Sequence, residues 1–301
     1  MSDGPAISVV IPAKNRAATL PRCLDSVLGQ SLPPAEVLVV DDGSTDATRE
    51  VLAAYASRGV VGLPLPAGRG AQAARNHGIR MARSAWIAFQ DSDDSWLPHK
   101  LALQAQALAA AGADPFTVVH GDALRCDEAS GRTTPYTVPT TEGDCHALLL
   151  QRPGPLFPTL LASKAALERI GGLDPDCPSY QEWDTAIRLA RHGRFVHVHE
   201  PLFTWIWHAS ETISKDPRRA VQGYRYVIEK HRADILARNG PRTWRRLKLD
   251  AVALALRGGL WAEAGDLMAG EAAHPSFALA RVLARLHLAP RGVGRALRLL
   301  A

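Results

Sequence analysis

A short apolar run that ends in a group of acids constrains this chain most. Four of the five residues at 86–90 are apolar, which is typical of a buried strand. Asp91, Asp93 and Asp94 follow where this strand should leave its sheet. In an extended chain Asp91 and Asp93 lie on one face, so both could bind the same divalent cation, whereas Asp94 points elsewhere. A turn in which these acids accept local hydrogen bonds is the alternative.

The beginning of the chain alternates between strand and helix patterns. Residues 7–11 predict a buried strand that Pro12 ends, and residues 36–40 predict a second one; each precedes a stretch with apolar residues at helical spacing. The loop at 12–16 lacks the glycines of a dinucleotide-binding or P-loop motif, which disfavours a dinucleotide dehydrogenase or a P-loop NTPase. The pattern therefore predicts an α/β sheet that binds its ligand at the carboxyl ends of its strands.

Two further loops carry candidate binding residues. Asp41 and Asp42 follow the second strand, where either carboxylate could accept a hydrogen bond from a nucleotide base. The alternative is that the following polar residues, Ser44 or Thr45, only cap the next helix, with Asp46 in its first turn.

The second loop, at 68–70, contains two glycines and leads from a short strand at 60–63 into a helix. Arg69 and Arg75 could bind a diphosphate beside the start of this helix. Arginines that are merely solvated on an exposed helix are the alternative.

The middle of the chain continues the α/β pattern and contains a second acidic group. We expect helices at 98–111, 163–170 and 185–192, strands at 116–121 and 196–199, and an irregular segment at 127–142 that could shape a binding pocket. Ser163 should cap its helix. Glu182 and Asp184 lie just before the last of these helices.

From residue 216 the composition changes to Ala, Leu and Arg with helical periodicity. The basic residues of this tail include Arg242, Arg245, Arg246, Lys248, Arg281, Arg285, Arg291, Arg295 and Arg298. They could contact anionic lipid, or they could form the solvated face of packed helices, which is the interpretation that we favour.

Composition restricts the partners and the compartment. A net charge of +5 suits a protein that meets phosphates or an anionic membrane, and no nucleic-acid-binding motif is present. The four cysteines are scattered without a C-x-x-C pair, as expected in a reducing cytoplasm. There is no signal-like N-terminus and no apolar run of about 18 residues, so we expect any membrane contact to be peripheral, at the inner face.

Four motifs in order resemble those of the family 2 glycosyltransferases, nucleotide-sugar enzymes of the GT-A fold. Residues 89–98 resemble the Asp-x-Asp segment, residues 39–46 the Val-Asp-Asp-Gly-Ser-x-Asp loop, and residues 74–79 the Ala-Arg-Asn-x-Gly-Ile pattern. Residues 171–184 resemble the Gly-Gly-hydrophobic-Asp segment with its acidic helix start. Residues 207–214 also resemble the closing loop of the family, which carries a histidine.

The resemblance implies a role for each candidate residue. It assigns Asp42 to the base, and Arg75 and Arg69 to the diphosphate. It assigns Asp93 to the metal, and Asp91 to the ribose or the metal shell. Further expected contacts of the nucleotide sugar are Pro12, Asp41 and Ser92. His208 could reach the metal or the diphosphate, or could be an ordinary surface residue.

The resemblance also makes Glu182 the general base, with Asp184 as the second candidate. The sequence departs from the family here, because Gln181 replaces the first acid of the motif and Glu182 replaces the usual aspartate. Either acid could instead only stabilise the start of the helix.

These expectations combine into one prediction. Residues 1–214 should form a GT-A domain with a mixed, mainly parallel sheet flanked by helices, and residues 215–301 an α-helical extension. With Mn²⁺ or Mg²⁺, the protein should move a sugar from a nucleotide-diphosphate donor to a sugar or lipid-linked acceptor, with inversion. A non-catalytic nucleotide-sugar binding or scaffolding protein is the main alternative. A sugar nucleotidyltransferase is disfavoured, since the glycine- and arginine-rich loop of those enzymes is absent.

Overall fold

The computed structural model describes residues 4–66, 68–207, 216–269, 275–289 and 292–299. The chain forms two compact units, each assembled from separate stretches. Unit 1 comprises Met1–His146, Gly154–Pro175 and Thr185–Ala209, and unit 2 comprises Ala147–Pro153, Asp176–Asp184 and Ser210–Ala301. The predicted domain boundary between residues 214 and 215 lies outside the described residues and stays a prediction.

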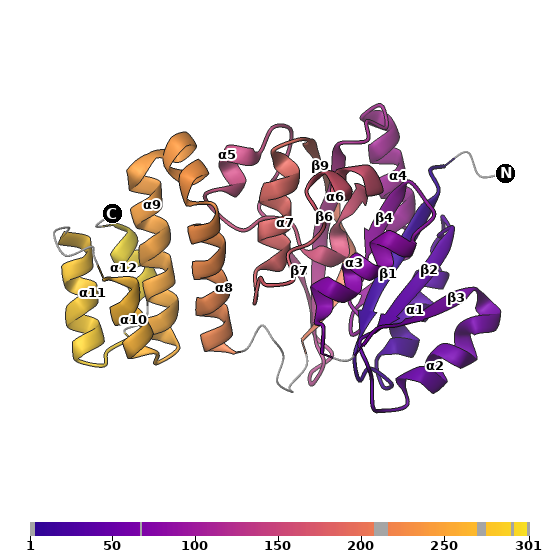
Figure 1. The fold of residues 1–301 in the computed structure, drawn as a ribbon, viewed down its shortest axis with the longest axis horizontal. Helices are drawn as coiled ribbons and strands as arrows, with labels where there is room; N and C mark the ends of the chain where they lie inside the picture. Colours follow the sequence, from indigo (N-terminus) through magenta and orange to yellow (C-terminus); the bar gives the residue numbers. More distant parts are fainter. Residues whose placement is uncertain (1–3, 67, 208–215, 270–274, 290–291, 300–301) are drawn as a thin grey trace. The chain divides into compact units, whose positions relative to one another are not determined.

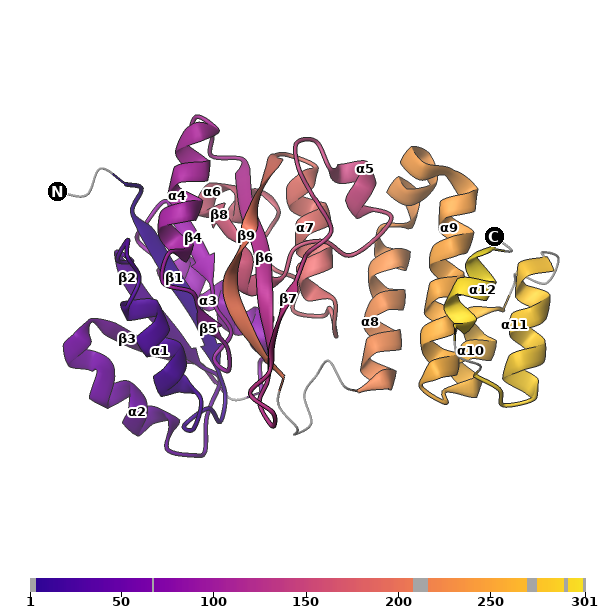
Figure 2. The same cartoon turned by 180° about the vertical axis from the view of Figure 1, so that it is seen from behind.

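Unit 1 is built on a mixed, mainly parallel sheet (Figures 1 and 2). Its strands are β1 (Ile7–Ala13), β2 (Glu36–Asp41), β3 (Val60–Pro64), β4 (Trp86–Phe89), β5 (Ser95–Trp96), β6 (Thr117–Asp127), β7 (Thr133–Tyr136), β8 (Leu161–Ser163) and β9 (Arg194–Trp207). Within the described residues their order is β3-β2-β1-β4-β8-β6-β9-β5, with β7 beside β6. Strands β1 to β4 are parallel, and β6 is parallel to β9, whereas β5, β7 and β8 pair antiparallel with their neighbours. This arrangement confirms the predicted fold class.

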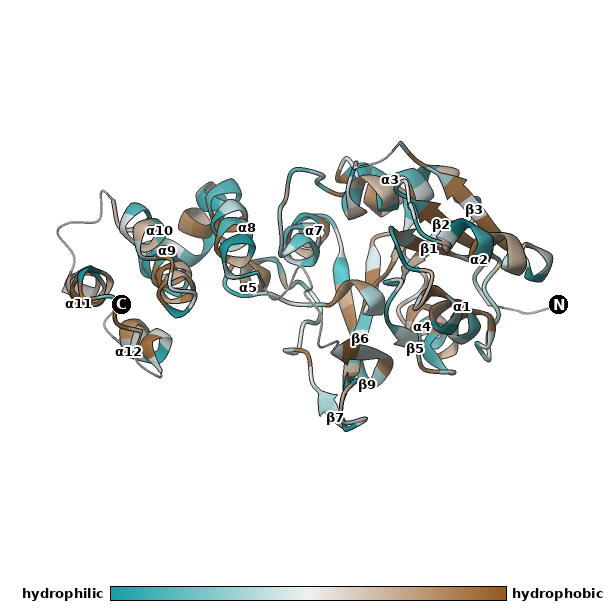
Figure 3. Cartoon of the chain, turned by 90° about the horizontal axis from the view of Figure 1, so that it is seen from below, coloured by the Kyte–Doolittle hydropathy of each residue, from teal (hydrophilic) through white to brown (hydrophobic). Residues whose placement is uncertain are grey.

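Helices cover both faces of this sheet. They are α1 (Leu20–Leu28), α2 (Thr48–Tyr55), the 3₁₀ helix η1 (Ala56–Arg58), α3 (Ala71–Met81), α4 (Lys100–Ala110), the 3₁₀ helix η2 (Phe157–Thr159) and α6 (Lys164–Arg169). Figure 3 shows α3 on one face of the sheet and α1 with α4 on the other. Two helices have residues in both units, α5 (His146–Leu149) and α7 (Gln181–Ala190).

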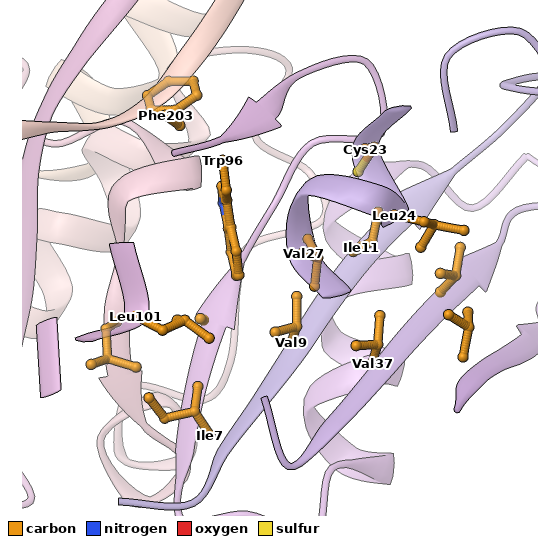
Figure 4. Packing of buried hydrophobic residues seen from close by; sticks show 14 of the residues in the cluster. Ile7, Val9, Ile11, Cys23, Leu24, Val27, Val37, Trp96, Leu101 and Phe203 are labelled. Atoms are coloured by element: carbon orange, nitrogen blue, oxygen red, sulfur yellow. The ribbon is translucent and has the colours of Figure 1, made fainter. Parts of the chain in front are cut away.

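The apolar core explains why these helices lie where they do. Residues of α1 at helical spacing, including Cys23 and Val27, are fully buried. Figure 4 shows them pointing toward the strands that carry Val9, Ile11 and Val37. Because β1 and β2 are buried on both faces, they contain nearly continuous apolar residues instead of an alternating pattern.

A glycine fixes the distance between α3 and the sheet. A Cβ atom at Gly78 would lie 2.5 Å from Cγ1 of Val10, so only glycine lets α3 approach β1 this closely. Asn76 of the same helix donates to the Leu173 carbonyl at 2.7 Å and accepts from the Leu173 amide at 2.8 Å. Helix α3 is therefore held both against β1 and against the segment at Leu173. Arg75, which directly precedes Asn76 in this helix, has a fixed position as a result.

Several local predictions differ from the structure. Pro12 lies inside β1 and does not end it, since β1 continues to Ala13. Neither Ser44 nor Thr45 caps α2, which begins at Thr48: Ser44 accepts a hydrogen bond from the Asn15 amide, and Oδ1 of Asp46 accepts from the Thr48 amide at 3.0 Å. The segment expected to be irregular contains β7, which pairs with β6. Ser163 does cap α6, by accepting from the Ala166 amide at 2.9 Å.

Unit 2 is helical in the part that the structure describes. Besides residues of α5 and α7 it contains α8 (Pro217–Lys230), α9 (Arg232–Arg257), α10 (Trp261–Leu267), α11 (Pro275–Arg285) and α12 (Val293–Leu299). Asp216 caps α8 by accepting from two backbone amides, and α9 is broken at Gly240, where φ is 77° and Pro241 follows. Each helix within the described ranges is too short or too polar to span a bilayer.

Candidate functional site

The acids after β4 form a tight turn and not an extended segment. Strand β4 ends at Phe89, and the Asp94 amide donates to the Asp91 carbonyl at 3.2 Å. The expected alternation of side chains therefore does not apply to Asp91 and Asp93. Both side chains nevertheless reach solvent, with exposed fractions of 33% and 27%. Because β1 lies beside β4 and β2 lies beside β1, this turn is close to the loops that follow β1 and β2.

Arg75 of α3 binds the acid turn directly. Its Nη2 lies 2.5 Å from Oδ1 of Asp91, and its Nη1 donates to Oε1 of Gln72 at 2.6 Å. The guanidinium also covers the ring of Phe157, 4.3 Å from its centroid. With only 6% of its side chain exposed, Arg75 is a buried partner of the acid turn and not a solvated surface residue.

Asp93 has arginine neighbours that the sequence did not assign to the site. Nη2 of Arg16, in the loop after β1, lies 3.4 Å from the Asp93 carboxylate. Arg22 of α1 donates to the Asp93 carbonyl at 2.9 Å. Both arginines follow β1, the strand beside β4, so strand adjacency was the signal that could have identified them.

Asp94 anchors the turn to β9. Its Oδ1 accepts from the Ile206 amide of β9 at 2.8 Å, and it is buried. Burial raises the pKa of Asp94 well above its usual value, and the charges of Asp91 and Asp93 add to this effect. Burial likewise raises the pKa of Asp91, although Arg75 opposes it. The turn thus concentrates negative charge that its arginine neighbours neutralise only in part.

This geometry fits a divalent cation that is shared with a ligand. Within the described residues no group of three His, Cys, Asp or Glu side chains converges, so the protein does not offer a complete cage there. Mg²⁺ is commonly held by one or two carboxylates together with phosphate oxygens and waters. Asp91 and Asp93 could provide the carboxylates, and a bound ligand the phosphate oxygens. His208, the third predicted metal ligand, lies outside the described residues.

The loop after β2 is organised by its two aspartates. Oδ1 of Asp41 accepts from the Ser44 amide at 2.8 Å and Oδ2 from Nε of Arg49 at 2.9 Å. Burial acts to raise the pKa of Asp41, but these hydrogen bonds outweigh it and lower the pKa. Asp42 accepts from the backbone amides of Arg69 and Gly70, so it ties the loop after β2 to the start of α3.

Asn15 connects the first loop to the second. It adopts a left-handed conformation, with φ of 53°, and its Oδ1 accepts from the Thr45 amide at 2.8 Å. Two more predicted contacts lie nearby: Pro12 is in β1 opposite Val40, and Ser92 is buried within the acid turn. The structure thus brings the unit 1 candidates to the carboxyl ends of β1, β2 and β4.

The two candidate bases lie in the first turn of α7, within unit 2. Helix α7 begins at Gln181, four residues before its predicted start. Glu182 is partly exposed, whereas Asp184 is fully buried, and its Oδ1 accepts from Nζ of Lys230 at 2.8 Å and pairs with Nε2 of His231 at 2.9 Å. The two acids therefore have different environments.

Comparison with known proteins identifies the family. The model of glycosyl transferase family 2 matches residues 8–167, which is more than half of the chain, so the protein belongs to this family. Among solved structures, Staphylococcus aureus TarS 1–349 in complex with UDP-GlcNAc superimposes with a TM-score of 0.64 at 17% identity, over 98% of this chain and 92% of that one. At this identity the likeness concerns the fold.

The chain is also similar to curated bacterial proteins. The succinoglycan biosynthesis protein ExoO of Rhizobium meliloti is 42% identical over 109 residues, 36% of this chain and 31% of that protein. An uncharacterised glycosyltransferase of Haemophilus influenzae is 26% identical over 228 residues, 74% of this chain and 76% of its own length. The Escherichia coli β-1,3-glucosyltransferase WfgD, which is named as a UDP-Glc enzyme, is 36% identical over 98 residues, 33% of this chain and 39% of that protein. The matched region thus spans about a third of the length of ExoO and WfgD.

Proposed function

We propose that this protein transfers a sugar from a nucleoside diphosphate sugar to an acceptor hydroxyl during polysaccharide biosynthesis, in a metal-dependent reaction that inverts the anomeric configuration. The acceptor would be a glycan or a lipid-linked sugar, met at the cytoplasmic face of the membrane. Residues 1–214 would form the transferase domain and residues 215–301 its helical extension.

The observation that carries this proposal is the ion pair between Arg75 and Asp91. It places a buried guanidinium on one partly exposed carboxylate, and Arg16 lies 3.4 Å from a second, that of Asp93, at the sheet edge where α/β proteins bind nucleotides. A diphosphate needs both kinds of partner, because its oxygens bind guanidinium groups directly and bind carboxylates only through a cation.

Each part of the donor has a residue of suitable chemistry. Asp42 would accept a hydrogen bond from the base, and Arg69 and Arg75 would bind the diphosphate. Asp93, with Asp91 beside it, would hold Mn²⁺ or Mg²⁺, which would neutralise the charge of the leaving diphosphate. Glu182 would take the proton of the attacking acceptor hydroxyl, and a single displacement of this kind inverts the anomeric carbon.

The test is a screen of donors with purified protein. UDP-glucose and UDP-GlcNAc come first, because the names of WfgD and of the TarS complex contain them. We expect release of nucleoside diphosphate with Mn²⁺ that EDTA abolishes, and a product whose NMR coupling shows the opposite anomer. Asp93→Asn should lose this activity, while Glu50→Gln, at an exposed acid of α2, should retain it.

The altered acidic motif supports a second candidate, a protein that binds nucleotide sugars without transferring them. Gln181 stands where the family has an acid, and Glu182 replaces an aspartate. Saturable donor binding without turnover on any acceptor would favour this function. Metal-independent turnover would instead leave a transferase but contradict the role of Asp93.

A further inference from the structure

Helix α11 carries apolar residues on two opposite faces. Phe277 and Ala280 are fully buried and pack it into unit 2. On the other side Leu279, Val282 and Leu286 have exposed fractions of 39%, 51% and 61%. Figure 3 shows α11 at the edge of this unit, with α9, α10 and α12 to one side of it. We call Leu279, Val282 and Leu286 the α11 apolar face. Such a surface usually marks contact with another molecule.

A basic groove lies next to this face. It has a volume of about 550 Å³ and runs between α10 and α11. Its lining includes Arg281, Arg285 and His287 together with Trp261 and Met268, and the His287 ring stacks on Trp261 with centroids 5.2 Å apart. The groove therefore offers cationic side chains above an apolar floor.

The spacing of residues along α11 connects the groove with the apolar face. At about 100° per residue, Arg281 and Arg285 lie between the buried side of the helix and Val282. The order around the helix is thus buried side, arginines, exposed apolar side chains. A helix at a bilayer surface has this arrangement, with arginines at the level of the phosphates and apolar side chains below them.

The positive charge of the chain is concentrated in its helical end, which contains α11. Residues 216–301 contain 16 Lys and Arg against 7 Asp and Glu, a formal charge of +9, whereas the whole chain carries +5. The rest of the chain is therefore acidic. An anionic surface would attract the helical end of the protein and repel the remainder, which favours one orientation.

The basic residues of α9 behave differently. Arg246 donates to the Gln151 carbonyl at 2.8 Å and pairs with Asp250, and Lys248 lies 5.9 Å from the centroid of the Trp244 ring. These side chains pack within unit 2, as the interpretation of solvated packed helices predicts. The lipid interpretation therefore has no support at these two residues of α9.

We propose that unit 2 binds the surface of an anionic phospholipid bilayer, with the α11 apolar face inserted among the acyl chains and with Arg281, Arg285 and His287 on lipid phosphates. We favour a bilayer over a protein partner because the formal charge of +9 on residues 216–301 complements an anionic surface. The inference is independent of the proposed sugar transfer, because bilayer binding needs neither donor nor acceptor.

The experiment is co-flotation of the full-length protein with vesicles. We expect binding to phosphatidylcholine vesicles that contain phosphatidylglycerol and little binding to phosphatidylcholine alone. Val282→Ser combined with Leu286→Ser should weaken partitioning at least about tenfold, because two apolar side chains no longer leave water. Arg285→Gln should weaken it about fivefold, and only on the anionic vesicles.

Matched variants of unit 1 are the controls. Met81→Ser removes an apolar side chain of similar exposure, 50%, and Arg80→Gln removes an exposed arginine; neither should alter flotation. Unchanged flotation of the Val282/Leu286 variant would overturn the proposal. Sedimentation data in which the wild-type protein is a dimer and this variant is a monomer would also overturn the proposal, because a second copy of the chain would then cover the α11 apolar face. Thermal unfolding should match wild type for every variant, because each position is exposed.

Discussion

The Asp42 carboxylate and the Gly70 backbone amide are joined by a hydrogen bond of 3.0 Å, and the Arg69 amide donates to the other carboxylate oxygen at 2.9 Å. Asp42 follows β2, and Gly70, with φ of 83°, immediately precedes α3. The residue expected to bind the base therefore also fixes the loop that leads to Arg75. In the proposed transferase, recognition of the base and the position of the diphosphate-binding residues would be coupled through this one side chain.

Asp42→Asn tests this coupling. An asparagine oxygen can accept one of the two backbone bonds, but its NH₂ group cannot accept the other, so the loop should loosen. We expect the donor KM to rise about tenfold, as for loss of one charge-assisted hydrogen bond, with a smaller change in kcat. Asp114→Asn, at an exposed acid of another loop, should change neither value. A fall in kcat at constant KM would show that Asp42 acts elsewhere.

The ion pair between Arg75 and Asp91 should contribute to stability as well as to binding. Arg75→Met keeps the length of the stem but leaves Asp91 beside Asp93 without its main cation. We expect a loss of about 1–3 kcal/mol in the free energy of unfolding, measured with urea. Adding Asp91→Asn should restore part of it, because the unpaired charge is then removed. Purely additive losses would show that the two residues do not interact.

A buried histidine should make the stability depend on pH. Burial lowers the pKa of His120 from 6.5 to about 4, and its Nε2 lies 2.8 Å from the Thr141 carbonyl. Between these pH values the unfolded chain binds a proton at His120 and the folded protein does not, so stability falls as pH decreases. His120→Gln should reduce this slope by up to about 1.4 kcal/mol per pH unit. His192→Gln, on the surface, serves as the control, and an unchanged slope for His120→Gln would refute the assignment.

The sequence was sufficient to predict the parts of the fold that depend on local pattern. Strands β1, β2 and β4 are short apolar runs followed by polar loops, and helices α1 and α3 have buried residues at helical spacing. Because parallel strands place their carboxyl ends at one edge, the loops of the site could also be predicted to lie together.

The sequence was insufficient where distant segments decide the structure. Strand β9 continues to Trp207 because it pairs with β6, about 80 residues earlier, and neither strand reveals this length by itself. The sequence near His197 also does not reveal that this residue is buried, with its Nε2 3.1 Å from Oδ1 of Asp122 in β6. The exposed face of α11 was also not predictable, because its residues follow the same apolar period as those of buried helices.

The buried environment of Asp184 predicts a structural role for this acid. Its contacts with Lys230 and His231 connect α7 to α8, and Asp184→Asn replaces the buried carboxylate that binds both groups with a neutral amide. We expect Asp184→Asn to lower the free energy of unfolding by about 2–4 kcal/mol. Transfer activity, corrected for the folded fraction, should remain close to wild type. A stable but inactive variant would instead support Asp184 as the base.

Glu182 should be the acid that removes the proton of the acceptor hydroxyl. It lies two residues before Asp184 in the same helical turn but remains partly exposed, so a substrate can reach it. An acceptor hydroxyl has a pKa far above neutrality, and a positioned carboxylate accelerates its attack about 10²- to 10⁴-fold. Glu182→Gln keeps the shape of the side chain and removes its basicity. We therefore expect transfer to fall by at least about 10²-fold, while donor affinity and the free energy of unfolding stay unchanged.

Glu229→Gln, on the exposed side of α8, is the control and should have no effect on transfer, donor affinity or the free energy of unfolding. Loss of donor binding in Glu182→Gln would assign Glu182 to the donor site, and near-normal transfer would show that no proton is taken by this residue.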